Sequence, residues 1–314
     1  MERPVNPLRS VLLAASQSPR LRRQATRHRF VRRAVSRFMP GETLDAAIQA
    51  AGALRAGGIA TILTHLGENV SDPAEAEAVV AHYHEVLEGI RRTALDAEVS
   101  VKLTQVGLDL DRDLACDHLA RIAGRARDVG NRVWIDMEAT PYADRTLEVF
   151  RRLRATYTNV GLCLQTYLRR TEADLESLLP LGASIRLVKG AYREPRELVF
   201  ARKADVDESF FRLSVRLLGE EARRAGARLV VGTHDTRLIG RIADHVATRG
   251  LAKDACEYAL LYGIQRREQA RLAREGFRVR VLISYGTHWF PWYMRRLAER
   301  PANLLFMGRS LLSR

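Results

Sequence analysis

The chain is poor in lysine and cysteine and has no long apolar run. Arginine provides 47 of its 51 basic side chains, so only four are lysines. The three cysteines (Cys116, Cys163 and Cys256) are odd in number and far apart, which argues against a disulfide framework or a zinc site and fits a reducing compartment. No apolar run reaches the roughly 18 residues of a membrane-spanning helix. We therefore expect a cytoplasmic protein.

Two of the four lysines end similar apolar runs. Lys102 closes the run at 99–102, and Lys189 stands near the end of the run at 185–190. Lysine is a compact point charge whose pKa responds to burial, whereas arginine is the default cation of this chain. A lysine at such a position is therefore either a chance occurrence or a group that binds a ligand.

Short runs rich in Val, Ile and Leu alternate with segments of helical period from residue 41 onward. Such runs are typical of strands that are buried on both faces of a parallel sheet. The eight strand candidates are residues 58–66, 99–106, 132–137, 160–166, 184–189, 228–233, 255–261 and 278–285. Several of the intervening helical segments end at glycine or proline, the usual stop signals. The longest gap, 194–225, has room for two helices.

Eight repeats of strand and helix predict a parallel sheet with right-handed crossovers. A doubly wound open sheet is the alternative, but it usually carries a Gly-rich fingerprint after its first strand. This chain has neither G-x-G-x-x-G nor a P-loop. We predict an α/β fold, a TIM-like (β/α)8 barrel at 41–314, with a basic helical arm at 1–40 and a short C-terminal tail around 303–312.

The net charge of +14 is concentrated in the first 40 residues. They hold ten arginines and one acid, which gives +9 and leaves +5 for the rest of the chain. A basic helix at 21–35 would suit an anionic lipid surface or nucleic acid, and it also resembles an Arg-rich transit peptide. A solvated arm, or a first helix packed on the barrel, explains the same pattern. No DNA- or RNA-binding motif accompanies it, so we expect no nucleic-acid partner.

Polar and ionisable residues follow the predicted strands at one end of the barrel, where the active sites of such barrels lie. They are Glu68, Lys102, Gln105, Asp136, Glu138, Gln165, Arg186, Lys189, Tyr192, Thr233, His234, Asp235, Tyr262 and Tyr285, with Arg295, Arg296 and Glu299 on the last helix. Taken singly, each fits rim packing, a structural ion pair or a solvated helix face. Together they predict an active site whose cations bind a carboxylate or a phosphate. A metal fits poorly, because His234 and Asp235 lack further ligands.

Six motifs resemble, in order, those of the proline dehydrogenase family. They are Val-Lys-Leu at 101–103, Ile-Asp-Met-Glu at 135–138, Arg-Leu-Val-Lys-Gly-Ala-Tyr at 186–192, Gly-Thr-His-Asp at 232–235, Leu-Leu-Tyr-Gly-Ile at 260–264, and Tyr-Gly-Thr-His at 285–288 leading into Met-Arg-Arg-Leu-Ala-Glu at 294–299. The resemblance implies a distorted (β/α)8 barrel that binds FAD without a Rossmann domain. It also implies oxidation of L-proline to Δ1-pyrroline-5-carboxylate, by hydride transfer from C5 to flavin N5.

The resemblance implies substrate-binding roles for eight residues. Lys102, Arg295 and Arg296 look like the clamp for the proline carboxylate, because three cations suit a small amino-acid anion. Asp136 resembles the acid that orders these cations, Tyr192 and Leu261 the apolar walls, and Glu68 the gate acid that pairs with an arginine. The eighth residue, Leu282, stands where the family usually has a tyrosine that contacts the proline ring. A bulkier or hydroxylated ring is therefore an open alternative, as is partial replacement of that tyrosine by Tyr285.

Seven further residues fall at positions that resemble the family's cofactor site. Arg186 looks like the donor near flavin N5 and Gln165 like the amide that reads the ring. The others are Lys189, Gly190, Thr233 and His234, which look like partners of the phosphate and adenosine portion, and Glu299, which falls near the flavin.

The family's electron acceptor is a membrane quinone, which implies a quinone partner here and peripheral contact of the basic arm with the inner face of the cell membrane. Two other functions remain open at this point. A class I aldolase-like barrel would use Lys102 or Lys189 as a Schiff base, but it explains neither the double arginine nor the missing Gly-rich loop after the seventh strand. A basic binding module with an inactive barrel is the other.

Overall fold

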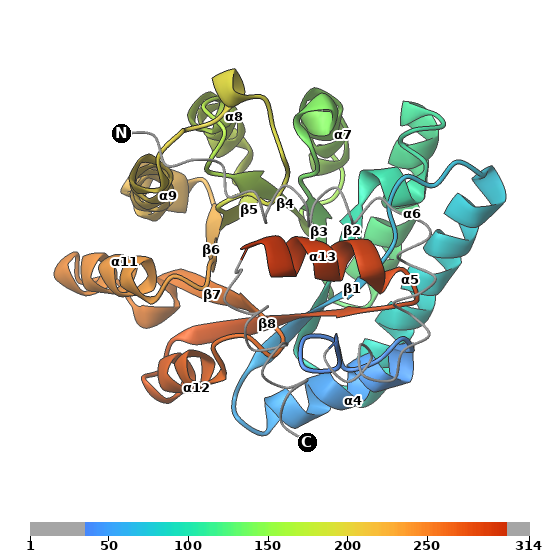
Figure 1. Ribbon diagram of the computed structural model, residues 1–314, viewed down its shortest axis with the longest axis horizontal. Coiled ribbons are helices and arrows are strands. Elements are labelled where there is room, and N and C mark those ends of the chain that lie inside the picture. The colour runs from blue at the N-terminus through green and yellow to red at the C-terminus, as the bar shows by residue number, and fades with distance from the viewer. Residues whose placement is uncertain (1–34, 300–314) are drawn as a thin grey trace, which may run out of the picture.

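Residues 35–299 form a closed barrel of eight parallel strands inside a ring of helices (Figure 1). The computed structural model describes these residues, with side chains as far as Arg295. The predicted TIM-like (β/α)8 fold is confirmed, and so are the two helices between the fifth and sixth strands. Most of the arm at 1–40 and the tail around 303–312 lie outside the described residues.

The strands are short and almost wholly buried, and each pairs in parallel with the next one along the chain. They are β1 (Ala60–His65), β2 (Ala97–Lys102), β3 (Val133–Asp136), β4 (Val160–Gln165), β5 (Ser184–Val188), β6 (Arg228–Gly232), β7 (Cys256–Leu261) and β8 (Arg278–Tyr285), and β8 closes against β1. Their apolar side chains are buried on both faces, because one face fills the barrel and the other packs under the helices.

Helices outside the barrel connect the strands. Local sequence sets their ends, as α5 shows: Asp72 accepts a hydrogen bond from the Ala74 amide at 2.8 Å, and proline occupies the first turn. The ring consists of α5 (Pro73–Thr93), α6 (Arg112–Asp128), α7 (Ala143–Arg154), α8 (Thr171–Leu178), α9 (Lys203–Leu218), α10 (Glu220–Arg224), α11 (Thr236–Thr248) and α12 (Arg266–Arg274). Within residues 35–299, no helix is both long and apolar enough to cross a bilayer.

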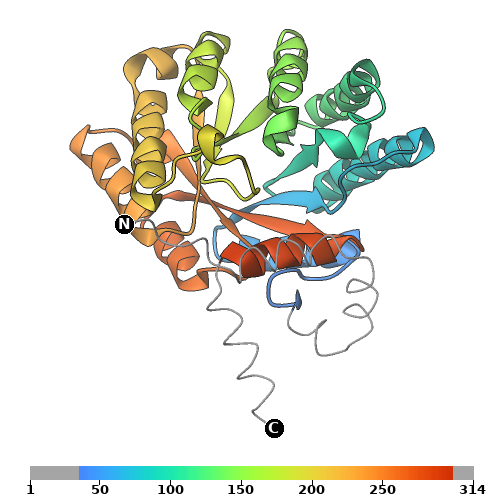
Figure 2. The same cartoon turned by 45° about the horizontal axis from the view of Figure 1, so that its top comes forward.

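The last helix departs from the regular pattern. α13 (Trp289–Glu299) runs across the opening at the carboxyl ends of the strands instead of joining the ring (Figures 1 and 2). Its position has a physical cause, because Trp289, Phe290 and Trp292 are buried in a cluster with Val35 and neighbouring apolar residues. The helix ahead of the barrel, α4 (Leu44–Arg55), packs on β1 and β8 and completes the ring.

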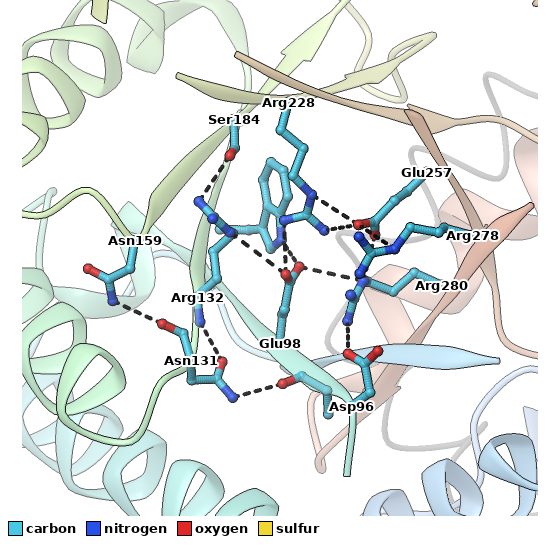
Figure 3. Close-up of polar contacts among 12 residues, drawn as sticks. Asp96, Glu98, Asn131, Arg132, Asn159, Ser184, Arg228, Glu257, Arg278 and Arg280 are labelled. Carbon is cyan, nitrogen blue, oxygen red and sulfur yellow. Dashed lines mark hydrogen bonds and ion pairs between the residues drawn. The ribbon is translucent and has the colours of Figure 1, made fainter. Parts of the chain in front are cut away.

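The opposite opening, at the amino ends of the strands, is closed by a network of buried charges (Figure 3). Glu98 accepts from Arg228 at 2.9 Å and from the Trp134 indole at 2.6 Å, and it also forms an ion pair with Arg280 at 3.6 Å. Glu257 pairs with Arg228 at 2.6 Å and with Arg280 at 2.9 Å. Each buried carboxylate thus has more than one cationic partner, which offsets the cost of its desolvation. This end of a barrel contributes to stability rather than to catalysis.

The pKa of Glu257 predicts that the barrel is sensitive to acid. Burial raises that pKa, but Arg280 and Arg228 outweigh burial and lower it from 4.5 to about 2. The ionised group contributes its full stabilisation above pH 4.5 and loses it as the pH falls toward about 2, because the unfolded chain takes up the proton first. We expect the free energy of unfolding, measured with urea, to fall by about 3 kcal/mol over this range. The E257Q variant should show a smaller fall, and an equal acid dependence in both proteins would contradict the assignment.

Candidate active site

A cavity of about 140 Å³ lies at the carboxyl ends of the strands, where Trp292 and Arg295 of α13 line it. It is lined by Thr64, Leu66, Lys102, Asp136, Met137, Ala191, Tyr192, Leu261, Leu282, Ser284, Trp292 and Arg295. Six of the eight residues expected at the substrate site therefore meet at one cavity. A seventh, Glu68, contacts it through Arg295, and the side chain of the eighth, Arg296, lies outside the described residues, as does that of Glu299. The geometry assembles these residues, and their roles stay predictions.

Arg295 joins α13 to the loop that follows β1. Its two terminal nitrogens donate to the Glu68 carboxylate at 2.6 and 3.2 Å, and its guanidinium lies 5.8 Å from the centre of the Tyr192 ring. Burial raises the pKa of Glu68, but the charges of Arg295 and Lys102 outweigh burial and lower it. Glu68 therefore stays a carboxylate and fixes the position of Arg295 at the cavity.

Lys102 ends β2 and is 9% exposed. Among residues 35–295, no carboxylate forms an ion pair with its ammonium group, although its charge lowers the pKa of both Glu68 and Glu138. A buried cation without a direct partner favours an anionic ligand. Lys102 is therefore the cation of this cavity that is best placed to receive a carboxylate from outside the protein.

Arg186 of β5 is buried inside the barrel and pairs with Asp136 of β3. The same nitrogen lies 3.0 Å from the Ser100 hydroxyl, which donates to Asp136 at 2.8 Å. Its guanidinium lies 5.2 Å from the centre of the Trp134 ring. Burial lowers the pKa of Arg186, but Asp136, together with smaller contributions from Cys163 and Glu98, outweighs burial and raises it. Ser100 was not expected here, although it lies two residues before Lys102 and hence on the same strand face.

Glu138 was expected at this end of the barrel, but the sequence assigned it no individual role. Both of its carboxylate oxygens accept from Thr104, from the amide at 3.1 Å and from the hydroxyl at 2.7 Å. Burial raises the pKa of Glu138 to about 7, against an opposing effect of Lys102. Glu138 therefore ties the end of β3 to the turn after β2, next to Lys102, and does not line the cavity itself.

Three buried polar atoms at this end of the barrel suit a polar cofactor. Within the described residues, Nη1 of Arg186, Oε1 of Gln165 and Oγ1 of Thr166 have no hydrogen-bond partner. Gln165 is oriented by its Nε2, which donates to the Met137 carbonyl at 3.0 Å. An unsatisfied buried polar atom costs about 1–3 kcal/mol, so a ligand edge with both donors and acceptors fits these atoms. The edge of a flavin ring has that character.

Lys189 belongs to a cluster of four charged residues. Its ammonium group pairs with Asp207 at 2.5 Å and with Asp235 at 2.7 Å. Lys203, to which the sequence gave no role, pairs with the same two carboxylates from α9. The charge of Lys189 is thus already balanced by protein groups, and its expected role at the cofactor phosphates stays a prediction.

The remaining cofactor candidates lie around the ends of β5 and β6. The Thr233 hydroxyl accepts a hydrogen bond from the Asp235 amide at 3.2 Å. Nε2 of His234 accepts one from the Leu261 amide at 2.9 Å. Because Nε2 is the acceptor, the ring proton of neutral His234 is on Nδ1. Gly190 has φ of 112°, and a Cβ there would lie 2.2 Å from a tyrosine ring, so no larger residue fits.

Tyr285 does not take the place of the missing tyrosine. Side chains alternate along β8, so Leu282 and Ser284 line the cavity whereas Tyr285 faces the helices. The Tyr285 hydroxyl hydrogen-bonds with Nε2 of His82 on α5 at 2.8 Å. The suggestion that Tyr285 replaces the family's tyrosine is therefore wrong, and Leu282 itself lines the cavity at this position.

Comparisons with known proteins agree with this geometry. A family model described as proline dehydrogenase matches residues 47–309. Proline dehydrogenase of Deinococcus radiodurans is 37% identical over 309 residues, which cover 97% of each chain. Proline dehydrogenase 1 of Bacillus subtilis strain 168 is 34% identical over 308 residues, which cover 98% of this chain and all of the relative.

A structural comparison supports the fold. Proline utilization A from Bdellovibrio bacteriovorus matches with a TM-score of 0.80 at 23% identity. The match covers 94% of this chain but only 36% of that much longer chain. At this identity, the likeness supports the barrel fold alone.

Proposed function

The chain belongs to the proline dehydrogenase family, and we propose that it oxidises L-proline to Δ1-pyrroline-5-carboxylate with FAD as cofactor. It is an oxidoreductase that acts on a CH–NH group. One observation carries the proposal: Lys102 and Arg295 line the same small cavity as the apolar residues Leu261 and Leu282. A carboxylate joined to a small apolar ring fits a cavity with that combination of walls.

The residues that would hold FAD are Gln165, Arg186, Lys189, Gly190, Thr233, His234 and Glu299. Two of them, Gln165 and Arg186, each have a buried side-chain atom without a hydrogen-bond partner among the described residues. When bound, the flavin supplies at N5 the acceptor for the hydride that leaves C5 of proline. Arg186 brings to this site a buried, permanently charged donor with one unpaired nitrogen, which favours an electron-rich ligand.

Lys102 and Arg295 bind the substrate carboxylate and so orient the ring. Both terminal nitrogens of Arg295 already donate to Glu68, so the substrate must share or displace Glu68. Substrate binding is thereby coupled to the contact between α13 and the loop after β1, as a gate requires. The amine must lose its proton before C5 can give up hydride. Among residues 35–295, Asp136 is the one carboxylate that lines the cavity, and it is paired with Arg186. We assign that proton to solvent.

Steady-state oxidation with a soluble quinone analogue tests the proposal. L-Proline should yield Δ1-pyrroline-5-carboxylate, and D-proline should react far more slowly, because a fixed carboxylate turns the other face of the ring toward the cofactor. Equal rates for the two enantiomers would contradict the carboxylate clamp. No product from L-proline would overturn the proposed reaction.

The aldolase alternative loses support on two grounds. Family membership favours oxidation, and the Lys189 ammonium donates to two carboxylates, which leaves no free amine for a Schiff base. Lys102 is better explained as a carboxylate ligand, since Arg295 lines the same cavity.

A quinone as acceptor and contact of the basic arm with anionic lipid complete the proposal. The +9 charge of residues 1–40 is the feature that supports lipid contact. Deletion of residues 1–36 should weaken binding to vesicles that contain anionic lipid, and unchanged binding would remove this part of the proposal.

A further inference from the structure

Ser284 of β8 presents an unused hydroxyl to the cavity. Its side chain is 1% exposed and lines the cavity, and its Oγ has no hydrogen-bond partner among the described residues. A buried hydroxyl without a partner costs about 1–3 kcal/mol, so its position favours a ligand that satisfies it. Neither the proposed carboxylate clamp nor the proposed cofactor site uses Ser284.

The surroundings of Ser284 place its hydroxyl beside the wall that faces the substrate ring. Leu282 lies two residues earlier on the same face of β8 and pairs in register with Leu261 of β7. Ser284 therefore stands one step, about 7 Å, beyond this apolar pair toward the carboxyl end of the strand. On its other side it pairs in register with Thr64 of β1, which also lines the cavity. The leucine side chains themselves offer no polar atom to the ring.

We propose that Ser284 is a specificity residue that hydrogen-bonds a hydroxyl group on the substrate ring, so that the enzyme also oxidises 4-hydroxy-L-proline. This inference rests on the proposed function and names a wider substrate class for the same cavity. The hydroxyl of Ser284 both donates and accepts, which suits a ring alcohol. Leu282 and Leu261 offer no polar atom to such a substituent, and Ser284 is the polar side chain that follows Leu282 on the same face of β8.

The test compares L-proline with the two C4 epimers of 4-hydroxy-L-proline, for the unmodified enzyme and for S284A. For at least one epimer, S284A should lower kcat/KM about 5- to 10-fold, the effect of one lost hydrogen bond. The value for L-proline should change less than about 2-fold. The dissociation constant of that epimer, measured by calorimetry, should rise by a similar factor, which provides a readout independent of turnover.

A matched control is S214A, which removes a buried serine hydroxyl that bonds the Phe210 carbonyl within α9, far from the cavity. S214A should leave unchanged the ratio of kcat/KM for each epimer of 4-hydroxy-L-proline to kcat/KM for L-proline. If both epimers are rejected, or if S284A affects all substrates equally, the inference is overturned while proline oxidation stands. If L-proline itself is not oxidised, the proposed function fails instead.

Discussion

Replacing Lys102 with methionine should raise the KM for L-proline about 100-fold and leave FAD bound. Methionine keeps most of the length of the side chain and removes its charge. Lys102 is buried and unpaired among the described residues, so its charge is available to the substrate carboxylate. Loss of a charge-assisted hydrogen bond of about 2.7 kcal/mol corresponds to that change in KM. Steady-state kinetics and the ratio of flavin to protein provide the two measurements.

A lysine outside the site provides the control for this variant. Lys253 is exposed, and its ammonium group donates to the Glu275 carbonyl. K253M should therefore leave both KM and flavin content unchanged. If K102M lost its flavin while K253M kept it, Lys102 would be a cofactor ligand, and the roles assigned to Lys102 and Lys189 would be reversed.

Replacing Asp136 with asparagine should destabilise the protein by about 3 kcal/mol and weaken FAD binding. The variant keeps an acceptor for Ser100 but leaves the buried guanidinium of Arg186 without an anionic partner. Removal of one member of a buried ion pair typically costs 3–5 kcal/mol, and partial exposure of Asp136 places the expected cost at the low end. Urea unfolding measures the stability, and titration of the apoprotein with FAD measures the affinity.

An aspartate–arginine pair away from the cavity makes the comparison specific. Asp113 and Arg152 form such a pair at 2.6 Å between α6 and α7, and both side chains are more than half exposed. D113N should cost less than about 1 kcal/mol and leave FAD affinity unchanged, because exposed ion pairs contribute little. Equal effects of D136N and D113N would show that the Asp136–Arg186 pair has no special role.

The fold was largely predictable because each strand is a short apolar run and each gap has a helical period. The placement of α13 was not, because the amphipathic pattern of Trp289 to Tyr293 shows that the helix is buried but not against which layer. The charged residues at the starts of the strands, such as Glu98 and Glu257, were also overlooked among apolar neighbours. Charges that interrupt otherwise apolar strands are a signal that could have revealed the network.

At the site, the positions of polar residues at the strand ends predicted which residues lie close together. These positions did not predict the direction in which each side chain points. The period of two along β8 already implied that Leu282 and Tyr285 point to opposite faces. The role of Glu138 and the presence of Ser284 in the cavity could not be predicted, because they depend on burial and on neighbours contributed by other strands. Lys203 gained its partners in the same way, through the approach of α9 to the end of β6.

Anaerobic titration of the purified, flavin-loaded protein with L-proline tests the central claim most directly. We expect a yellow protein whose flavin absorbance is bleached by L-proline without any other reductant, because the proposed reaction transfers hydride from the substrate to the flavin. A protein that binds flavin but is not bleached by L-proline would contradict the proposed reaction. A colourless protein that borohydride links covalently to a keto substrate would instead establish Schiff-base chemistry.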